Sequence, residues 1–319
     1  METVVVRFIT DKPVKKTAYQ VKGVFMKYYS RSSAVPMLDG TYRNKYLYPR
    51  VQVKILNEQI YVVGIKEGAD AVQKLAEEVK TLNFGNITFD VTDTDVETTE
   101  NRFQHIDQLL RYRFVSPWVA LGNTTQNRYK FLKNKDRIAF LNKLLGQNIV
   151  FLGREMEVDL QEKVYTKIRL SSLLPKPVDE DNWGAFTGEF QTNFVLPDYI
   201  GIGNGITRGY GAIHGLYNPE DYDFENGLLN VDNTTPIVYE EDDTLKSIVV
   251  KNVPRPRRKS KNSKGKKSQK DSTKSISSGN GKLKKKQPKK QKKQTKKLIK
   301  EFDDDTFNTI EYHQKQHKV

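Results

Sequence analysis

The segment Gly201–Gly211, which reads GIGNGITRGYG, constrains the fold of this chain more than any other stretch. Glycine adopts positive φ angles and lets another backbone approach closely, so this density of glycines predicts a loop in contact with backbone or phosphate. Arg208 inside the loop supplies a planar donor group that suits phosphate. The alternative is a tight turn between core elements. The five glycines are Gly201, Gly203, Gly205, Gly209 and Gly211.

Two common nucleotide-binding loops do not fit this segment. The second glycine pair begins six residues after Gly203, so the G-x-G-x-x-G pattern of dinucleotide-binding folds is not met. A P-loop is excluded as well, because no Gly-Lys-Ser or Gly-Lys-Thr follows the glycines.

The net charge of +15 is concentrated at one end of the chain. The range 255–300 holds 21 Lys and Arg residues and one acid, Asp271, whereas the rest of the chain has a net charge of −5. A lysine-rich sequence with this Ser and Gln bias cannot bury a core, so we expect residues 255–319 to be a disordered basic tail with an acidic end. Such a tail binds nucleic acid without sequence preference or, alternatively, only keeps the protein in solution.

Two further basic blocks lie within the folded part. The range 12–66 has a net charge of +9 and the range 111–176 has +8, while 67–107 holds ten acidic and three basic residues. Basic blocks in an otherwise balanced body indicate a binding face for an anionic partner.

Composition also narrows the class of protein. The chain has no cysteine, which excludes disulfides and thiolate metal sites. The start METVVVRFIT lacks the features of a signal peptide, and no apolar run approaches the roughly 18 residues of a membrane helix. No set of histidines and carboxylates indicates a metal site. We therefore expect a cytoplasmic protein without cofactor or membrane contact.

The first half of the chain predicts a split β-α-β unit. Expected strands lie at Thr3–Ile9, Pro49–Leu56, Gln59–Ile65 and Ile87–Val91, and expected helices run from Pro13 to about Tyr29 and over Glu67–Leu82. The alternation of Val51, Val53 and Ile55 with Arg50, Gln52 and Lys54 is typical of a strand with one buried face. The order βαββαβ is that of a ferredoxin-like domain.

A second set of elements follows. Gln108–Leu121 is expected to be rich in strand and Gln126–Glu157 to be mainly helical, with Phe140, Leu141, Leu144 and Leu145 facing the core. Strands are expected at Val164–Leu170, Phe186–Val195 and Ala212–Leu216. The fold class is thus α+β, with tandem ferredoxin-like (RRM-like) domains over 1–95 and 96–217, an acidic turn-rich extension over 218–254 and the tail from 255.

Aromatic and basic residues interleave between the first helix and the second strand. Basic residues among tyrosines suit single-stranded or looped RNA, which they bind through phosphate contacts and base stacking. The alternative is a core helix followed by a solvated loop, in which Tyr28 and Tyr48 are buried. Trp118 and Trp183 are interpreted as core residues. The interleaved residues are Lys27, Tyr28, Tyr29, Arg31, Tyr42, Arg43, Lys45, Tyr46, Tyr48, Arg50 and Lys54.

Three segments together carry a family resemblance. YLYPRVQVKILNEQIYVVGI at Tyr46–Ile65, LLRYRFVSPWVAL at Leu109–Leu121 and GAFTGEFQTNFVLPDYIGIGNGITRGYGAI at Gly184–Ile213 occur in this order, and the last contains the pattern G-x-G-x-x-x-x-x-G-x-G. The chain resembles the CRISPR repeat-processing endoribonucleases of the RAMP superfamily over about Thr3–Leu216. The resemblance implies tandem ferredoxin-like domains, binding of CRISPR repeat RNA and metal-independent cleavage within each repeat. The tail is not part of this pattern.

The resemblance also locates the candidate site. The usual family histidine lies in the loop before the YP-containing strand, and here that loop contains no histidine. Tyr42, Lys45 and Lys54 are therefore the candidate catalytic residues, while His105 and His214 are given structural or surface roles. The candidate RNA-binding residues are Lys27, Arg31, Arg43, Arg50, Gly201, Gly203, Arg208, Gly209 and Gly211.

Two functions remain open. The first is an endoribonuclease that uses the RNA 2′-hydroxyl as nucleophile to make guide RNAs; histidine-less relatives that use Lys, Arg and Tyr favour it. The second is a non-catalytic RAMP-type subunit that holds the repeat-derived handle among CRISPR effector complex subunits; the missing histidine favours it. A tail-driven nonspecific nucleic-acid binder fits the detailed match of the body less well.

Overall fold

The computed structural model of the chain describes residues 1–178, 182–219, 222–223, 228–229 and 244–255. These residues all belong to one compact unit, Met1–Lys259. The predicted basic tail after Arg255, and most of the predicted acidic extension, lie outside the described residues.

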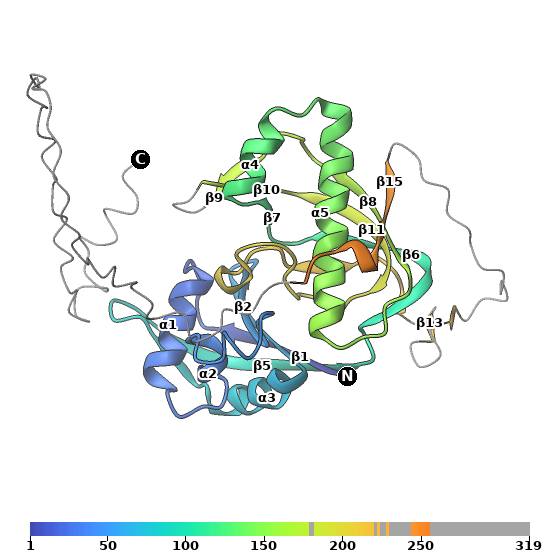
Figure 1. Cartoon of the computed structure of the whole chain (residues 1–319). Helices are drawn as coiled ribbons and strands as arrows, with labels where there is room; N and C mark the ends of the chain where they lie inside the picture. Colours follow the sequence, from blue (N-terminus) through green and yellow to red (C-terminus); the bar gives the residue numbers. More distant parts are fainter. Residues whose placement is uncertain (179–181, 220–221, 224–227, 230–243, 256–319) are drawn as a thin grey trace, which may run out of the picture. The chain divides into compact units, whose positions relative to one another are not determined.

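The N-terminal half forms the predicted ferredoxin-like unit (Figure 1). Its antiparallel sheet has the order β2-β3-β1-β5-β4, and the helices cover one face. Val4, Val6 and Phe8 alternate along β1 and are fully buried on that face. The elements are β1 (Glu2–Thr10), α1 (Ala18–Tyr28), α2 (Val35–Leu38), β2 (Val51–Leu56), β3 (Gln59–Ile65), the 3-10 turn η1 (Lys66–Gly68), α3 (Ala69–Glu78), β4 (Thr81–Asn83) and β5 (Thr88–Glu100).

Three boundaries in this half differ from the prediction. The first helix begins at Ala18 and not at Pro13, because Thr17 caps it by accepting a hydrogen bond from the Gln20 amide. The second helix ends at Glu78 and not at Leu82, because Thr81–Asn83 pairs with β5. Strand β5 continues to Glu100, beyond the predicted strand end at Val91, since all of β1 pairs with its residues from Val91 to Glu100.

The C-terminal half has a second antiparallel sheet with the order β12-β6-β11-β8-β15 and a small sheet with the order β7-β10-β9. Helix α5 packs on β8 and β15 (Figure 1), and Leu141 and Leu145 are buried there, while Phe140 and Leu144 are half-buried. The elements are β6 (Gln104–Phe114), β7 (Trp118–Leu121), α4 (Asn123–Lys130), α5 (Asn134–Glu155), β8 (Lys163–Leu170), β9 (Lys176–Val178), β10 (Trp183–Phe186), β11 (Gly188–Val195), β12 (Ile213–Gly215), β13 (Tyr222–Asp223), β14 (Leu228–Leu229) and β15 (Leu245–Val249).

The glycine-rich segment stands where a complete ferredoxin-like unit has its second helix. Strands β8, β11, β6 and β12 lie in the order of such a unit, and residues 196–212 connect its third and fourth strands. Within residues 196–212 the structure shows one short helical element, the 3-10 turn η2 (Ile206–Arg208). A thin glycine-rich backbone therefore replaces a helix at this place.

Strand β15 is an addition that the sequence interpretation missed, because it lies within the range assigned to a turn-rich extension. It pairs with the outer edge of β8, and Ile248 packs against Gly146 of α5, where a Cβ would lie 2.7 Å from the isoleucine. The Arg154 guanidinium donates to the carbonyls of Val250 and Val253, at 2.6 and 2.8 Å. The next turn, η4 (Val250–Asn252), is thus fixed to α5.

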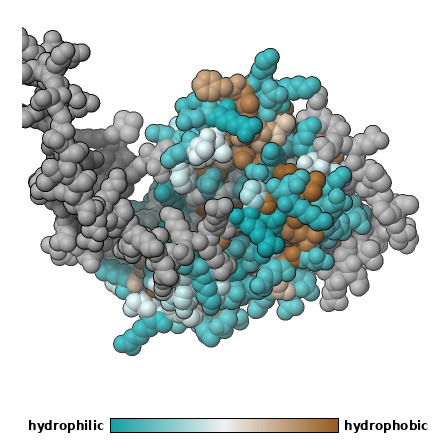
Figure 2. Space-filling model, in the orientation of Figure 1, coloured by the Kyte–Doolittle hydropathy of each residue, from teal (hydrophilic) through white to brown (hydrophobic). Residues whose placement is uncertain are grey.

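The core consists of two clusters of buried side chains. One lies between the N-terminal sheet and its helices. The other fills the C-terminal half and includes Val5, Val63 and Ile65 from the opposite face of the N-terminal sheet, so the two halves share it. Trp118 is fully buried, as predicted, whereas Trp183 is only partly buried. The surface in Figure 2 is mainly hydrophilic with scattered apolar areas.

Candidate functional site

The glycine-rich segment needs its glycines for conformation and for close packing. Gly203, Gly209 and Gly211 have φ angles of 94°, 96° and 71°, which lie in the left-handed region. A Cβ at Gly211 would lie 2.0 Å from the Ile202 carbonyl oxygen, and one at Gly209 would lie 2.8 Å from the Ala18 Cβ. A side chain at either position would collide with the protein itself.

The amides of this segment are also used inside the protein. Gly201 donates to Gln52 Oε1 at 2.9 Å, Gly209 to the Ile206 carbonyl at 3.1 Å and Gly211 to the Pro117 carbonyl at 2.9 Å. Close approach of protein backbone is therefore what these glycines serve here, and contact with RNA phosphate at Gly201, Gly203, Gly209 and Gly211 stays a prediction.

Strand β2 holds the glycine-rich segment through three side chains. The Tyr48 hydroxyl, just before the strand, donates to the Gly201 carbonyl at 2.8 Å, and Gln52 accepts from the Gly201 amide. The Lys54 ammonium donates to the Tyr210 carbonyl at 3.1 Å. All three side chains are at most 1% exposed. These three residues, which we call the β2 clamp, connect the N-terminal sheet to the segment that replaces the helix.

The location of Lys54 corrects its assignment as a catalytic residue. Its side chain has no exposed surface, so its amine does not reach a bound RNA in this conformation. Burial lowers the pKa of Lys54 to about 7, because the protein interior disfavours the charged form. Lys54 instead supports the glycine-rich segment through its hydrogen bond to the Tyr210 carbonyl.

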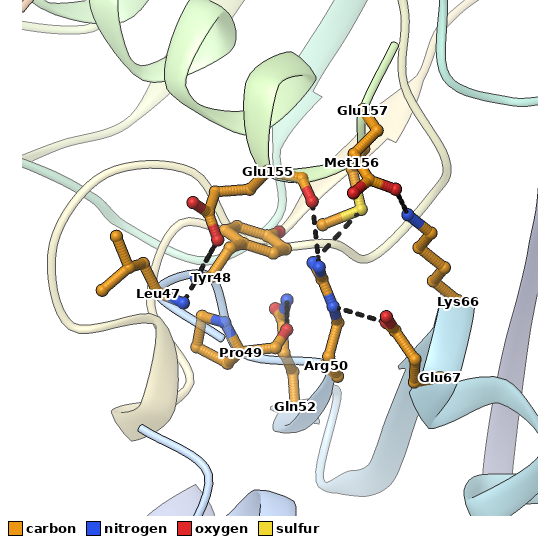
Figure 3. Close-up of polar contacts among 10 residues, drawn as sticks. All are labelled: Leu47, Tyr48, Pro49, Arg50, Gln52, Lys66, Glu67, Glu155, Met156 and Glu157. Carbon is orange, nitrogen blue, oxygen red and sulfur yellow. Dashed lines mark hydrogen bonds and ion pairs between the residues drawn. The ribbon is translucent and has the colours of Figure 1, made fainter. Parts of the chain in front are cut away.

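The segment before β2 is fixed to the C-terminal end of α5 (Figure 3). The Glu155 carboxylate accepts hydrogen bonds from the amides of Leu47, at 3.1 Å, and Tyr48, at 3.4 Å. The Arg50 guanidinium donates to the Glu155 carbonyl at 2.9 Å and forms an ion pair with Glu67 at 2.8 Å. An ion pair between Lys66 and Glu157 lies beside them.

Arg50 was predicted to contact RNA, and the structure gives it a different role. Its side chain is 5% exposed and its donors point to α5 and to Glu67 (Figure 3). A buried guanidinium that is satisfied in this way connects the two halves of the protein and is not available to a phosphate.

Tyr42 and Lys45 lie together on an exposed turn ahead of this anchored stretch. The rings of Tyr42 and Tyr46 meet edge to face with centroids 6.0 Å apart, and the Lys45 ammonium lies 5.5 and 4.8 Å from them. A side-chain hydrogen bond with Tyr46 raises the pKa of Lys45. Lys45 is thus a persistent cation and not a base.

The remaining basic candidates are exposed. Lys27 lies over the ring of Tyr28, 5.2 Å from its centroid, and Tyr28 is 46% exposed and so outside the core. Arg31 and Arg43 are exposed in the stretch between α1 and β2. Arg208, at the end of η2, lies 5.2 Å from the centroid of the Trp183 ring. These side chains are placed where an anionic ligand can reach them.

Both histidines of the folded part have partners. His105 Nε2 lies 3.0 Å from the Lys163 carbonyl and 2.9 Å from the Asn193 amide nitrogen. His214 Nδ1 lies 3.2 Å from Asp198 Oδ2, and this contact raises the pKa of His214. Both histidines thus have partners within the protein, and their structural or surface roles stay a prediction.

A row of aromatic rings between the two halves was not predicted from the sequence. His214 stacks on Tyr199 with ring centroids 5.7 Å apart, and the Tyr199 ring lies tilted by 39° against that of Tyr61 of β3, with centroids 4.9 Å apart. Tyr199 adopts a φ of 62°, which is uncommon for a residue other than glycine, and only a structure reveals this angle. Sequence spacing carries no signal for a contact between residues so far apart.

Within the described ranges, no group of three or more His, Asp or Glu side chains is arranged to hold a metal ion. None of the helices in the described part of the chain has the length and apolar character needed to cross a bilayer.

Known proteins match both halves of the chain. Residues 1–102 match the Cas6b N-terminal domain, and residues 104–216 match the Cas6b C-terminal domain. A crystal structure of Cas6b is 28% identical with a TM-score of 0.57, and the match covers 68% of this chain and 100% of that one. A crystal structure of the CRISPR RNA processing endoribonuclease Cas6b shares the fold at 24% identity, a TM-score of 0.51 and the same coverage.

A sequence relative is also known. An uncharacterised protein of Methanocaldococcus jannaschii is 25% identical over 135 residues, which are 42% of this chain and 92% of that protein. The two domain matches follow each other along residues 1–216 and together span most of the chain. With its tandem ferredoxin-like halves and its glycine-rich segment, the chain belongs to the Cas6b family of CRISPR-associated RAMP proteins.

Proposed function

We propose that this protein binds CRISPR repeat RNA and cleaves precursor CRISPR RNA within its repeats to give guide RNAs. Membership of the Cas6b family in both halves carries the proposal. A structural relative is described as a CRISPR RNA processing endoribonuclease, and it shares the fold of this chain. The cytoplasm is the compartment in which such RNA would be met.

The exposed cations around the glycine-rich segment support RNA as the ligand. Lys27, Arg31 and Arg43 lie on α1 and the loop after it, and Arg208 lies on η2, which packs against α1 and β2. Strand β2 and α5 both hold this region, so the cations are presented on a fixed surface. A polyanion with accessible bases fits cations placed next to the rings of Tyr28, Tyr42 and Trp183.

The reaction we propose is an attack by the RNA's own 2′-hydroxyl. The 2′-oxygen loses its proton and forms a bond to phosphorus, the bond from phosphorus to the 5′-oxygen breaks, and the 5′-oxygen takes a proton from water. The products are a 2′,3′-cyclic phosphate and a 5′-hydroxyl. In this proposal Tyr42, as a phenolate, takes the 2′-hydroxyl proton, and Lys45 stabilises the additional negative charge on the crowded phosphate. The raised pKa of Lys45 suits this second role, because the ammonium keeps its charge at neutral pH. The proposed reaction needs no metal ion or cofactor.

One observation favours a second function. The segment between Arg31 and Tyr46 has no histidine, and Lys54, a third candidate, is buried. A protein that binds the repeat and retains it as a subunit of an effector complex, without cutting it, needs the same cationic surface and no base.

The test is incubation of the purified full chain with repeat RNA in EDTA, followed by analysis of the product ends. We expect a cyclic phosphate on the upstream product and a 5′-hydroxyl on the downstream one, with Tyr42→Phe slower and His105→Ala unchanged. Cleavage that requires added metal would contradict the mechanism. Tight binding without cleavage at any pH would contradict the proposed endoribonuclease activity and favour the non-catalytic, RNA-binding subunit.

A further inference from the structure

Phe131 is the most exposed large apolar side chain of the described structure. It caps the C-terminal end of α4 and is 89% exposed. Figure 2 shows apolar side chains at this end of the C-terminal half, where α4 leads into α5, among hydrophilic neighbours. A ring this exposed gains little from the protein's own core and is available to a ligand.

The surroundings of Phe131 are basic. The range 123–135 contains four Lys and Arg residues and no acid. Lys130 and Lys133 are exposed, and neither forms an ion pair with another of the described residues. An exposed aromatic ring that lies between two such lysines in the sequence suits a polyanion that also offers flat bases, which is single-stranded nucleic acid. A protein partner of this patch would need an acidic face with an apolar centre.

The backbone beneath Phe131 is held in place by its neighbours. The Tyr129 side chain is 2% exposed, and its hydroxyl donates to the Leu173 carbonyl at 2.8 Å. The Arg137 guanidinium lies 5.1 Å from the Tyr129 ring centroid, and the Phe131 amide donates to the Arg128 carbonyl at 3.3 Å. The buried tyrosine anchors the turn, so the Phe131 ring, two residues later, is presented outward on a fixed support.

Helix α4 also connects this ring to the glycine-rich segment. The Trp183 indole, which lies under Arg208, donates to the Asn123 side chain at 3.2 Å, and Asn123 is the first residue of α4. The eight residues of α4 span about 12 Å at a rise of about 1.5 Å per residue. An extended strand that contacts Arg208 therefore reaches Phe131 after a few nucleotides.

We propose that Phe131 stacks on an unpaired base of the bound RNA while Lys130 and Lys133 contact the adjacent phosphates, so that α4 extends the RNA track away from the glycine-rich segment. The proposal rests on the proposed function for the identity of the RNA. It adds a contact that is tolerant of sequence, because every base has a flat face. Nucleotides outside the repeat can therefore use it.

The experiment uses the full chain and repeat RNA that carries a short oligouridine extension at one end or the other, with 2-aminopurine within the extension. Stacking on Phe131 quenches the 2-aminopurine fluorescence. We expect Phe131→Ala to abolish the quenching for one of the two extensions and to weaken binding of that RNA about tenfold. Phe131→Trp should retain both effects. Leu174→Ala, at another exposed apolar residue of the same half, is the matched control and should change neither.

The outcomes separate this inference from the function on which it rests. Repeat RNA that binds the wild-type and Phe131→Ala proteins equally, with equal quenching on both extensions, would overturn the inference and leave the proposed function standing. Phe131→Leu that retains the quenching and the affinity of the wild-type protein would overturn the inference, because leucine has no flat ring to stack on a base. Wild-type protein that fails to bind any repeat RNA would overturn both. Because Phe131 is exposed, its variants are expected to fold normally, which circular dichroism checks.

Discussion

The Lys54→Met variant is predicted to be more stable than the wild-type protein at low pH and less stable than it at high pH. Lys54 is completely buried, and its pKa falls from 10.5 to about 7. Each unit of this shift corresponds to about 1.36 kcal/mol, so burying the charged amine costs on the order of 5 kcal/mol in the folded protein. The methionine variant is free of this cost, but it leaves the Tyr210 carbonyl without its donor, a loss of about 1–3 kcal/mol.

The sign of the pH dependence follows from proton counting. Below about pH 7 the amine is protonated in both the folded and the unfolded chain, so the full cost is present. Between about pH 7 and 10.5 the unfolded chain binds one more proton than the folded chain, and the stability of the wild-type protein rises by about 1.36 kcal/mol per pH unit relative to the variant. The variant is thus expected to be more stable by about 2–4 kcal/mol at pH 6 and less stable by about 0–2 kcal/mol near pH 10, where about 1 kcal/mol of the burial cost remains in the wild-type protein.

Urea unfolding at several pH values between about 6 and 10 measures the free energies of unfolding. Lys143→Met on α5 is the matched control, since Lys143 is exposed, and its difference from wild type should not depend on pH in this way. Groups that titrate in all three proteins contribute equally to their free energies of unfolding, so they cancel when each variant is compared with the wild type. Parallel stability profiles for wild type and Lys54→Met would refute the reasoning, because they would show that the amine keeps an ordinary pKa and is hydrated.

Three further outcomes are expected. Gly209→Val should destabilise the fold by about 2 kcal/mol or more in urea unfolding, because of its positive φ and its closeness to Ala18, whereas Arg208→Ala should fold normally and bind repeat RNA more weakly in filter-binding titrations. Deletion of the chain after Pro254 should flatten the salt dependence of RNA binding and spare discrimination between repeat and scrambled RNA; loss of that discrimination would contradict this. Single-turnover cleavage in EDTA should speed up from about pH 6 to pH 9, as expected for a tyrosine base, and Tyr42→Phe or Lys45→Ala should slow it; a rate independent of pH would exclude that base.

The fold of the N-terminal half could be predicted because its signals are local. Alternation in β1, β2 and β3 and helical spacing in α1 and α3 give the element order, and that order gives the ferredoxin-like unit. Helix ends were predicted less well, because the Thr17 cap and the pairing of β4 with β5 outweigh proline and leucine as boundary signals. Strand β15 was missed because an edge strand after a long acidic stretch has no pattern of its own.

The site was predicted only in part, for a reason that Lys54 and Arg50 illustrate. Their alternation with Val51 and Val53 correctly indicates two faces of β2, but the polar face was assigned to solvent. In the structure the glycine-rich segment and the end of α5 cover that face, through contacts that span more than 100 residues of sequence. The role of a polar residue on a strand depends on which distant segment packs over it, and hydrophobic periodicity gives no information about that segment.

The substitution of a glycine-rich backbone for a helix explains how the candidate site is built. A helix is about 10 Å across, and at this place it would hold the two halves apart. The thin segment 201–211 instead lies directly on β2, where the β2 clamp holds its carbonyls and amides. The same close approach brings the end of α5 onto the residues that follow Tyr42 and Lys45, so the C-terminal half fixes the exit of the loop that carries them. The N-terminal half carries Tyr42 and Lys45, the reacting groups that we propose, and the C-terminal half fixes the residues that follow them.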